Sequence, residues 1–311
     1  MKGQKLKGNC LLLLAALVWG ISFIAQSKGV ETIPPATFNG VRSILGGVVL
    51  LPVIFLIDFF KKKQAIETKK IDKTLFVGGV VCGLFLCLAS TLQTVGMLYT
   101  SPGKAGFITA LYMVIIPIIR LFMGEKPRAV VLIAVIVAVV GMYLMCMDSE
   151  FSVNKGDAII FVCAFLFAGH ILAINHFSPK VDGVKLACMQ FFVCGVLDLI
   201  FAFIFEKPEV KSLLDGWMSI GYAGIMSCGV AYTLQIIGQK YTDPTSASIL
   251  MSLESVFSTL TTVLLIACGW SLTGGSLDTR EIFGCIFMFI AIMFVQLPEK
   301  NTGEKGINQN C

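Results

Sequence analysis

The residues of this sequence that could do chemistry are polar side chains set inside long apolar stretches. Glu254 stands ten residues past Pro244, which places it about 15 Å along a helix that starts at the proline. In a membrane this depth is near the middle of about 30 Å of hydrocarbon, where a carboxylate is costly unless it is paired, protonated or hydrated. We therefore expect Glu254 to bind substrate or carry a proton; a protonated Glu bonded to a neighbouring helix is the structural alternative.

Six other side chains are expected to share one central site with Glu254, because each can hydrogen-bond or stack from within an apolar stretch. They are Tyr112, Gln93, Gln235, His170, Trp19 and Tyr232. Buried amides either bond across helices or line a hydrated cavity, and a histidine there could titrate near neutral pH. The structural alternatives are packed rings and internally bonded polar groups. The sequence predicts no catalytic residue and no metal ligand.

Two of these residues belong to a segment that occurs twice. Residues 91–102 read TLQTVGMLYTSP and residues 233–244 read TLQIIGQKYTDP, so seven of the twelve positions are identical at an offset of 142 residues. Gln93 and Gln235 are equivalent positions, and the same offset pairs Tyr112 with Glu254. Each copy ends one apolar stretch and begins the next. Duplicated membrane units of this kind are common in secondary transporters.

The elements that must position these residues are membrane-spanning helices. Hydrophobic residues make up 56% of the 311-residue chain and charged residues only 14%, whereas average soluble domains are about 25% charged. Stretches long enough to cross a bilayer lie at roughly 9–28, 34–58, 74–98, 103–123, 128–147, 156–176, 184–205, 216–238, 245–269 and 281–297. The expected fold class is an all-α polytopic membrane protein with ten transmembrane helices, arranged as two inverted five-helix repeats.

The inverted arrangement follows from the distribution of cations. With the N-terminus inside, 17 of the 24 Lys and Arg residues fall in inner loops. We therefore expect a protein of the cell (plasma) membrane with both termini in the cytoplasm. The first copy of the duplicated segment then lies outside and the second inside. We expect residues 1–150 and 151–297 to form the two repeats, and residues 298–311 to be a disordered cytoplasmic tail.

Besides the duplicated segment, the chain contains four further motifs: TSPGKAGFITALYMVIIPI at 100–118, LVWGISF at 17–23, Arg42 within FNGVRSILGG, and the pair Gly124-Glu125. Together these motifs resemble the EamA-type branch of the drug/metabolite transporter superfamily. The resemblance covers essentially the whole chain and implies a ten-helix bundle around a central cavity, with efflux of amino acids or exchange of sugar nucleotides among the family activities. The second half departs from the pattern, because its ninth stretch ends in CGWSLTGGSLDTRE rather than a direct Gly-Glu pair.

The function expected from these features is secondary transport of a small polar metabolite, most simply proton-coupled amino-acid or metabolite efflux by alternating access. A sugar-nucleotide or vitamin-type exchanger or importer, a channel and a membrane enzyme are the alternatives. The expected partners are the substrate, protons and the lipid bilayer, without nucleic acid. The sequence contains no nucleotide-binding motif through which ATP could drive transport. Neither the eleven cysteines nor the two histidines show metal spacing, so no cofactor is expected.

Overall fold

The computed structural model describes residues 2–64, 72–100, 102–125, 127–146, 154–268 and 279–297. All regular structure within these residues is helical. The elements are α1 (Lys2–Val30), α2 (Pro35–Lys63), α3 (Lys73–Met97), α4 (Pro102–Ala110), α5 (Tyr112–Phe122), α6 (Ala129–Cys146), α7 (Lys155–Phe177), α8 (Gly183–Phe205), α9 (Val210–Asp215), α10 (Trp217–Tyr222), the π-helix η1 (Ala223–Tyr232), α11 (Thr233–Gln239), α12 (Pro244–Met251), α13 (Glu254–Ala267) and α14 (Thr279–Gln296). The expected tail at 298–311 lies outside the described residues.

Eight helical segments within the described residues are long and apolar enough to cross a membrane. Three of them join several elements: α4 runs on into α5, α10 continues through η1 into α11, and α12 is followed by α13. Two shorter apolar helices, Ala129–Leu144 and Ile282–Val295, fall where the fifth and tenth spans were expected. The chain is therefore a multi-pass membrane protein whose described part is helical throughout its regular structure.

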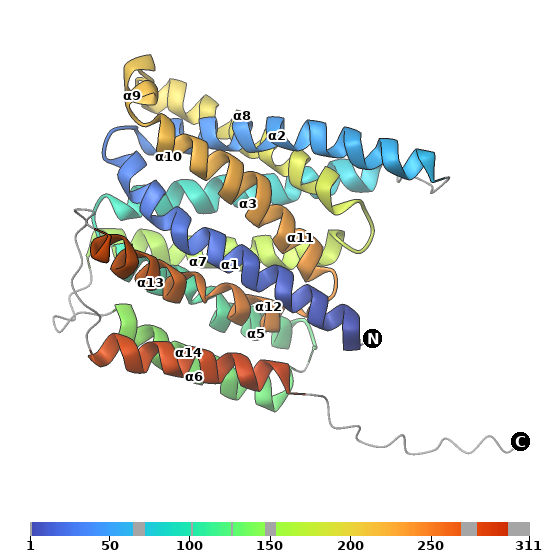
Figure 1. Cartoon of the computed structure of the whole chain (residues 1–311), viewed down its shortest axis with the longest axis vertical. Helices are drawn as coiled ribbons and strands as arrows, with labels where there is room; N and C mark the ends of the chain where they lie inside the picture. The colour runs from blue at the N-terminus through green and yellow to red at the C-terminus, as the bar shows by residue number, and fades with distance from the viewer. Residues whose placement is uncertain are drawn as a thin grey trace, which may run out of the picture.

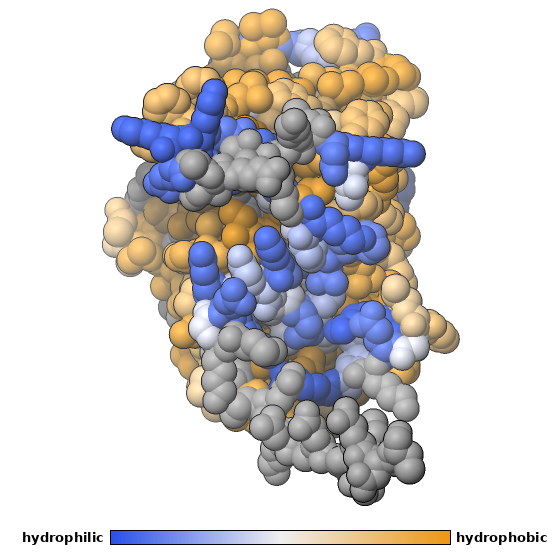
Figure 2. All heavy atoms as spheres, turned by 90° about the vertical axis from the view of Figure 1, so that its right-hand side faces the viewer, coloured by the Kyte–Doolittle hydropathy of each residue, from blue (hydrophilic) through white to orange (hydrophobic). Residues whose placement is uncertain are grey.

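The helices lie side by side and run between two faces of the molecule (Figure 1). We call the face at which α1 begins and α14 ends the termini face, and the other the opposite face. Figure 2 looks onto the termini face, where hydrophilic side chains gather at the centre and hydrophobic ones surround them. The flanks carry large exposed apolar side chains such as Phe55, Phe122 and Phe203, which suit contact with lipid.

Polar side chains fix where several helices begin. The carboxylates of Asp72, Asp182 and Asp243 accept hydrogen bonds from the first backbone N–H groups of α3, α8 and α12. The carboxylate of Glu206, at the end of α8, accepts from the backbone N–H groups of Ala36 and Thr37 at 2.9 and 2.8 Å, and so caps α2. These bonds satisfy helix-end groups that apolar surroundings cannot.

The two copies of the duplicated segment make matching contacts with helices of the other half. A Cβ added to Gly156 would meet the carbonyl oxygen of Gly96 at 2.6 Å, and a Cβ added to Gly8 would meet that of Gly238 at 2.8 Å. Close backbone approach of this kind requires glycine. The sequence repeat is thus matched by a repeat in packing: α7 lies against the end of α3 as α1 lies against the end of α11.

Hydroxyl groups of the two copies repeat the pattern. Thr100 donates to the Asp157 carboxylate at 2.7 Å, and its equivalent Thr242 donates to the Asn9 side-chain oxygen at 3.0 Å. The first contact lies at the opposite face and the second at the termini face. Each therefore joins one half of the chain to the first helix of the other half.

Two spans expected as single helices are interrupted, and the interruptions are equivalent. The fourth breaks at Leu111, between α4 and α5, and the ninth at residues 252–253, between α12 and α13. Near the second break the Ser252 hydroxyl donates to the carbonyl oxygen of Ile249 at 2.8 Å, which competes with the helical backbone bonds. In α5, Pro117 supplies no N–H to the turn before it. With the offset of 142, Leu111 corresponds to Leu253.

Candidate substrate-binding site

A pocket of about 530 Å3, part of it open to solvent, lies between the two halves of the chain. Its walls come from α1, α2, α3, α4, α5, α7, η1, α11, α12 and α13. The lining residues are Trp19, Phe23, Gln26, Arg42, Gln93, Thr109, Tyr112, Phe167, His170, Ile171, Ser227, Tyr232, Gln235, Met251 and Glu254. The structure thus brings all seven residues singled out from the sequence to one space; that they bind substrate stays a prediction.

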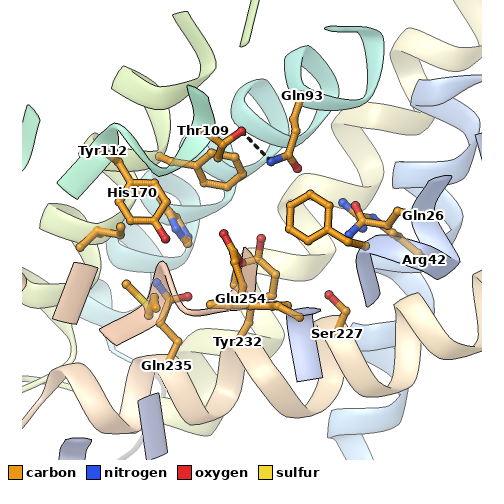
Figure 3. A pocket seen from close by; sticks show the side chains of 15 residues that line it. Gln26, Arg42, Gln93, Thr109, Tyr112, His170, Ser227, Tyr232, Gln235 and Glu254 are labelled. Carbon is orange, nitrogen blue, oxygen red and sulfur yellow. Dashed lines mark hydrogen bonds between the residues drawn. The ribbon is translucent and has the colours of Figure 1, made fainter. Parts of the chain in front are cut away.

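Glu254 and Tyr112 face each other because each is the first residue after a helix break. The Tyr112 hydroxyl points toward the Glu254 carboxyl group (Figure 3), and the two groups interact electrostatically. Glu254 is 8% exposed and Tyr112 is 5% exposed. A break in each half therefore brings a hydroxyl and a carboxyl group together near the middle of the bundle.

The π-helix η1 turns two further residues toward the pocket. Hydrogen bonds from i to i+5 place residues five apart above one another, so that Ser227 and Tyr232 share a face. The Tyr232 ring packs edge-on against Trp19, with ring centroids 4.7 Å apart, and against Phe191 at 5.5 Å. This aromatic wall continues to His170, whose ring lies 6.0 Å from that of Tyr232.

Two amides and a histidine occupy fixed positions around the space. Gln93 donates to the Thr109 hydroxyl at 3.1 Å, a bond from α3 to α4 (Figure 3). The Nε2 atom of His170 lies 3.1 Å from the side-chain oxygen of Gln190, and His170 is 1% exposed. Gln235 is 2% exposed and extends into the pocket from α11. Nε2 of His170 is therefore bonded to Gln190, whereas Nδ1 has no hydrogen-bond partner among the described residues.

A cation lies at the other side of the pocket from Tyr112 and His170. Arg42 is 5% exposed and donates through one terminal nitrogen to Gln26 at 2.7 Å. Its guanidinium also lies over the Phe38 ring, 5.4 Å from the centroid. Figure 3 shows Arg42 and Gln26 on one side and Glu254 between them and the far wall. Within the described residues the pocket thus combines one fixed cation with one carboxyl group.

Several buried polar atoms of the lining residues have no hydrogen-bond partner among the residues that the structure describes. They are Nε1 of Trp19, Nε of Arg42, Nδ1 of His170 and Oε1 of Gln235. Buried polar groups cost free energy unless they are bonded. A polar ligand with both donor and acceptor groups would satisfy them.

Sequence reasoning missed part of the lining. Gln26 and Phe23 follow Trp19 at spacings of seven and four residues, which places all three on one helix face. That spacing was a usable signal. The other lining residues not assigned to the site were Arg42, Thr109, Phe167, Ile171, Ser227 and Met251.

A buried acid next to the pocket was also missed. Asp198 is fully buried in α8. It is a lone carboxylate in an apolar stretch, so the rule that singled out Glu254 would have found it. Within the described residues no group of three or more His, Cys, Asp or Glu side chains could hold a metal ion.

Comparison with known proteins agrees with this architecture. A model of the EamA-like transporter family matches the chain twice, over residues 6–147 and 154–297. An uncharacterized transporter of Archaeoglobus fulgidus is 30% identical over 298 residues, which cover 94% of this chain and 87% of that protein. The uncharacterized inner membrane transporter YedA of Escherichia coli K12 is 20% identical over 289 residues, 90% of this chain and 88% of that protein.

The fold is also known from a solved structure. A crystal structure at 18% sequence identity superposes with a TM-score of 0.71 and covers 92% of this chain and 95% of that chain. The helices, the pocket and these matches together define a polytopic membrane transporter. The chain belongs to the EamA-like transporter family, within the drug/metabolite transporter superfamily, which confirms the resemblance read from the motifs.

Proposed function

We propose that this protein is a secondary transporter of small zwitterionic metabolites of the amino-acid type, and that Glu254 couples their movement to protons. The observation that carries the proposal is the presence of both Arg42 and Glu254 in the lining of one pocket with aromatic walls. A guanidinium binds a carboxylate well, and a carboxyl group binds an ammonium group. A zwitterion offers both in one small molecule.

The shape of the pocket supports a small substrate with an apolar body. Aromatic rings of Trp19, Tyr112, Phe167 and Tyr232 form much of the wall. Ligand sites of this kind bind an apolar part by contact and fix its orientation through a few polar groups. The unpartnered atoms of His170 and Gln235 would add hydrogen bonds.

Alternating access by two inverted five-helix repeats, ten spans in all, is the mechanism that we propose. Three matches between the halves support it: the two family matches, the equivalent contacts of Thr100 and Thr242, and the equivalent breaks at Leu111 and Leu253. Broken helices at the interface of inverted repeats are a recurring way to build a substrate site. Exchange of roles between the halves would then expose the pocket to one face after the other.

We place the termini face in the cytoplasm. Lys61, Arg120, Arg128 and Lys185 lie there, in agreement with the positive-inside rule. Residue 68 falls in the loop expected on that side. Labelling of a cysteine at position 68, in a chain without the native cysteines, by an impermeant thiol reagent on intact cells would contradict this orientation.

The test of the function is transport by purified protein in proteoliposomes. We expect counterflow of amino acids and, under an imposed proton gradient, their accumulation. The variant Glu254→Gln keeps the size and hydrogen bonding of the side chain but cannot bind and release a proton. We therefore expect this variant to lose accumulation of substrate driven by the proton gradient. Exchange of substrate at equal pH on both sides should persist.

The matched control is Glu31→Gln, which removes an exposed carboxylate that pairs with Lys28 away from the pocket. It should accumulate substrate as the native protein does. If Glu254→Gln also accumulates substrate at the native level, Glu254 is structural and His170 is the next residue to test. Flux without saturation or counterflow would instead identify a channel.

A further inference from the structure

A second buried carboxylate lies behind the pocket, where three helices meet. Asp198 of α8 accepts hydrogen bonds from the Thr91 hydroxyl of α3 at 2.5 Å and from the Cys87 thiol of α3 at 3.2 Å. The Cys194 thiol, one turn earlier in α8, donates at 3.3 Å. All three donors are neutral. A fully buried carboxylate with only neutral partners still needs a nearby positive charge to be held as an anion.

Arg42 belongs to the part of α2 that packs on α8 beside this carboxylate. A Cβ added to Gly40 would meet the Leu199 side chain at 2.8 Å, and Ser43 lies 3.5 Å from the Cys194 sulfur atom, which itself bonds Asp198. Arg42 and Asp198 interact electrostatically, while the Arg42 guanidinium hydrogen-bonds Gln26. The Cys228 thiol of η1 interacts electrostatically with both groups, and the Tyr232 hydroxyl with Arg42. The positive charge of Arg42 is therefore opposed by the negative charge of Asp198, which does not line the pocket.

We propose that Asp198 is the fixed counter-charge of Arg42 and that, by cancelling this charge, it makes the pocket reject net anions and select molecules that carry an amine. The proposal rests on the transport function proposed above and concerns its specificity. Asp198 acts through Arg42 and is a positioning residue, since it does not touch the space that substrate would occupy.

The physical reason is that the net charge of Arg42 acts on a ligand over a longer distance than its N–H donors do. Arg42 keeps N–H donors for a substrate carboxylate, and these act at contact. Its net charge would attract any anion from farther away in a low-dielectric site, but the charge of Asp198 opposes that field. The remaining charged group of the pocket is Glu254, which repels anions and attracts an ammonium group. A zwitterion can use both groups, whereas a simple carboxylate meets Glu254 uncompensated.

The first test needs no ligand. Thermal unfolding in detergent is compared for the native protein, Arg42→Gln, Asp198→Asn and the double variant. Each single change leaves one buried charge without its partner, and the double change removes both. We expect the midpoint of the double variant to fall by less than the sum of the single losses, by about 2–4 °C or more. Additive losses would overturn the pairing.

The second test compares three probes with one phenyl ring each: 3-phenylpropionate, 2-phenylethylamine and phenylalanine. Their affinities are measured by ligand-induced thermal shift. The native protein should bind the two amine-bearing probes at least tenfold more tightly than the carboxylate. In Asp198→Asn the affinity for 3-phenylpropionate should rise at least tenfold. A folded Asp198→Asn protein with unchanged preference would overturn the proposal.

Thr91→Val is the matched control, because it removes the hydroxyl bond to Asp198 and leaves both charges in place. It should lower the thermal midpoint and keep the native order of probe affinities. A change of preference in Thr91→Val equal to that in Asp198→Asn would assign the effect to geometry and so overturn the role of charge. If no probe binds the native protein, the proposed substrate class is wrong, while the unfolding cycle still decides whether Arg42 and Asp198 are paired.

Discussion

The two copies of the duplicated segment lie at opposite ends of the molecule and share their backbone contacts, but only one of them carries an ion pair in addition. At the termini face Arg120 of α5 donates to the Thr245 hydroxyl at 3.0 Å and lies 3.3 Å from the Asp243 carboxylate. The offset of 142 replaces Arg120 with Thr262 and Asp243 with Ser101 in the other copy. Thr262 and Ser101 carry no charge, so they cannot form an ion pair.

This difference separates two tasks. Contacts present in both copies, such as those of Gly96 and Gly238, hold the halves of the chain together. The contact of Arg120 joins α5 to α12, which belong to different halves and both contribute to the lining of the pocket. The shared contacts thus hold the halves together at both faces, whereas the unshared one joins them at the termini face alone.

The largest effect is expected where the copies agree. Gly8→Ala and Gly156→Ala each place a methyl group within 3 Å of a backbone oxygen, and should each lower the free energy of unfolding by about 1–3 kcal/mol. The control Gly221→Ala has no atom within 4 Å and should be neutral or slightly stabilising. Denaturant unfolding in detergent measures all three. A loss in only one of the first two variants would show that the contacts are not equivalent.

The equivalent threonines should differ in magnitude. Thr100→Val removes a hydrogen bond to the Asp157 carboxylate, and Thr242→Val removes one to the neutral Asn9 side chain. Bonds to charged groups contribute about 1.5–3 kcal/mol and neutral ones about 0.5–1.5 kcal/mol. We expect the larger loss of unfolding free energy in Thr100→Val, by the same measurement. Equal or reversed losses would contradict the distinction between the copies.

A smaller effect is expected from the unshared contact. Arg120→Gln should weaken the attachment of the start of α12 by about 1 kcal/mol, since Arg120 is only partly exposed. Amide hydrogen exchange at residues 243–248 should then rise about fivefold. Arg128→Gln is the control at the same face, because Arg128 bonds the backbone oxygens of Val295 and Leu297 instead. Equal exchange in both variants would show that Arg120 does not hold α12.

The smallest effect concerns pH at the termini face. Burial raises the pKa of Asp182, but the Lys61 ammonium and the backbone N–H groups of Lys185 and Val184 outweigh it, so that the pKa is lowered. The stabilisation is thus present above the usual value near pH 4 and is lost as pH falls through the lowered pKa. With solvent screening it is below about 1 kcal/mol.

Thermal unfolding between pH 7 and pH 3 tests this. The native protein should lose slightly more stability than Asp182→Asn, whereas Asp215→Asn, which alters an exposed acid at the opposite face, should follow the native curve. An identical pH dependence in the native protein and Asp182→Asn would remove the ion pair with Lys61 from the account of this face.

The sequence predicted the positions of the polar residues along their helices better than their surroundings. Counting from Pro102 and Pro244 placed Tyr112 and Glu254 at one depth, and both reach the pocket. Depth follows from helical rise alone. The break before each residue and the π-helix η1 were not predicted, because both depend on local competition for backbone hydrogen bonds that the apolar pattern does not record.

The direction in which each helix faces was equally hidden. In a soluble protein the apolar stripe would indicate the buried side. Here lipid is as apolar as the core, so apolar residues occur on every side of α3 and α8, and the two sequences do not show which residues meet. The contact of Thr91 with Asp198, and the approach of Arg42 to both, therefore required the structure.

The exchange of first helices between the halves has a consequence for biogenesis. The bond between Asn9 and Thr242 spans 233 residues of sequence, and α1 packs mainly on η1, α11, α12 and α13. During synthesis α1 would enter the bilayer early, but the helices on which it packs would follow only after most of the chain had been made. The first half expressed alone should therefore insert but remain sensitive to membrane proteases, and coexpression of the second half should protect it.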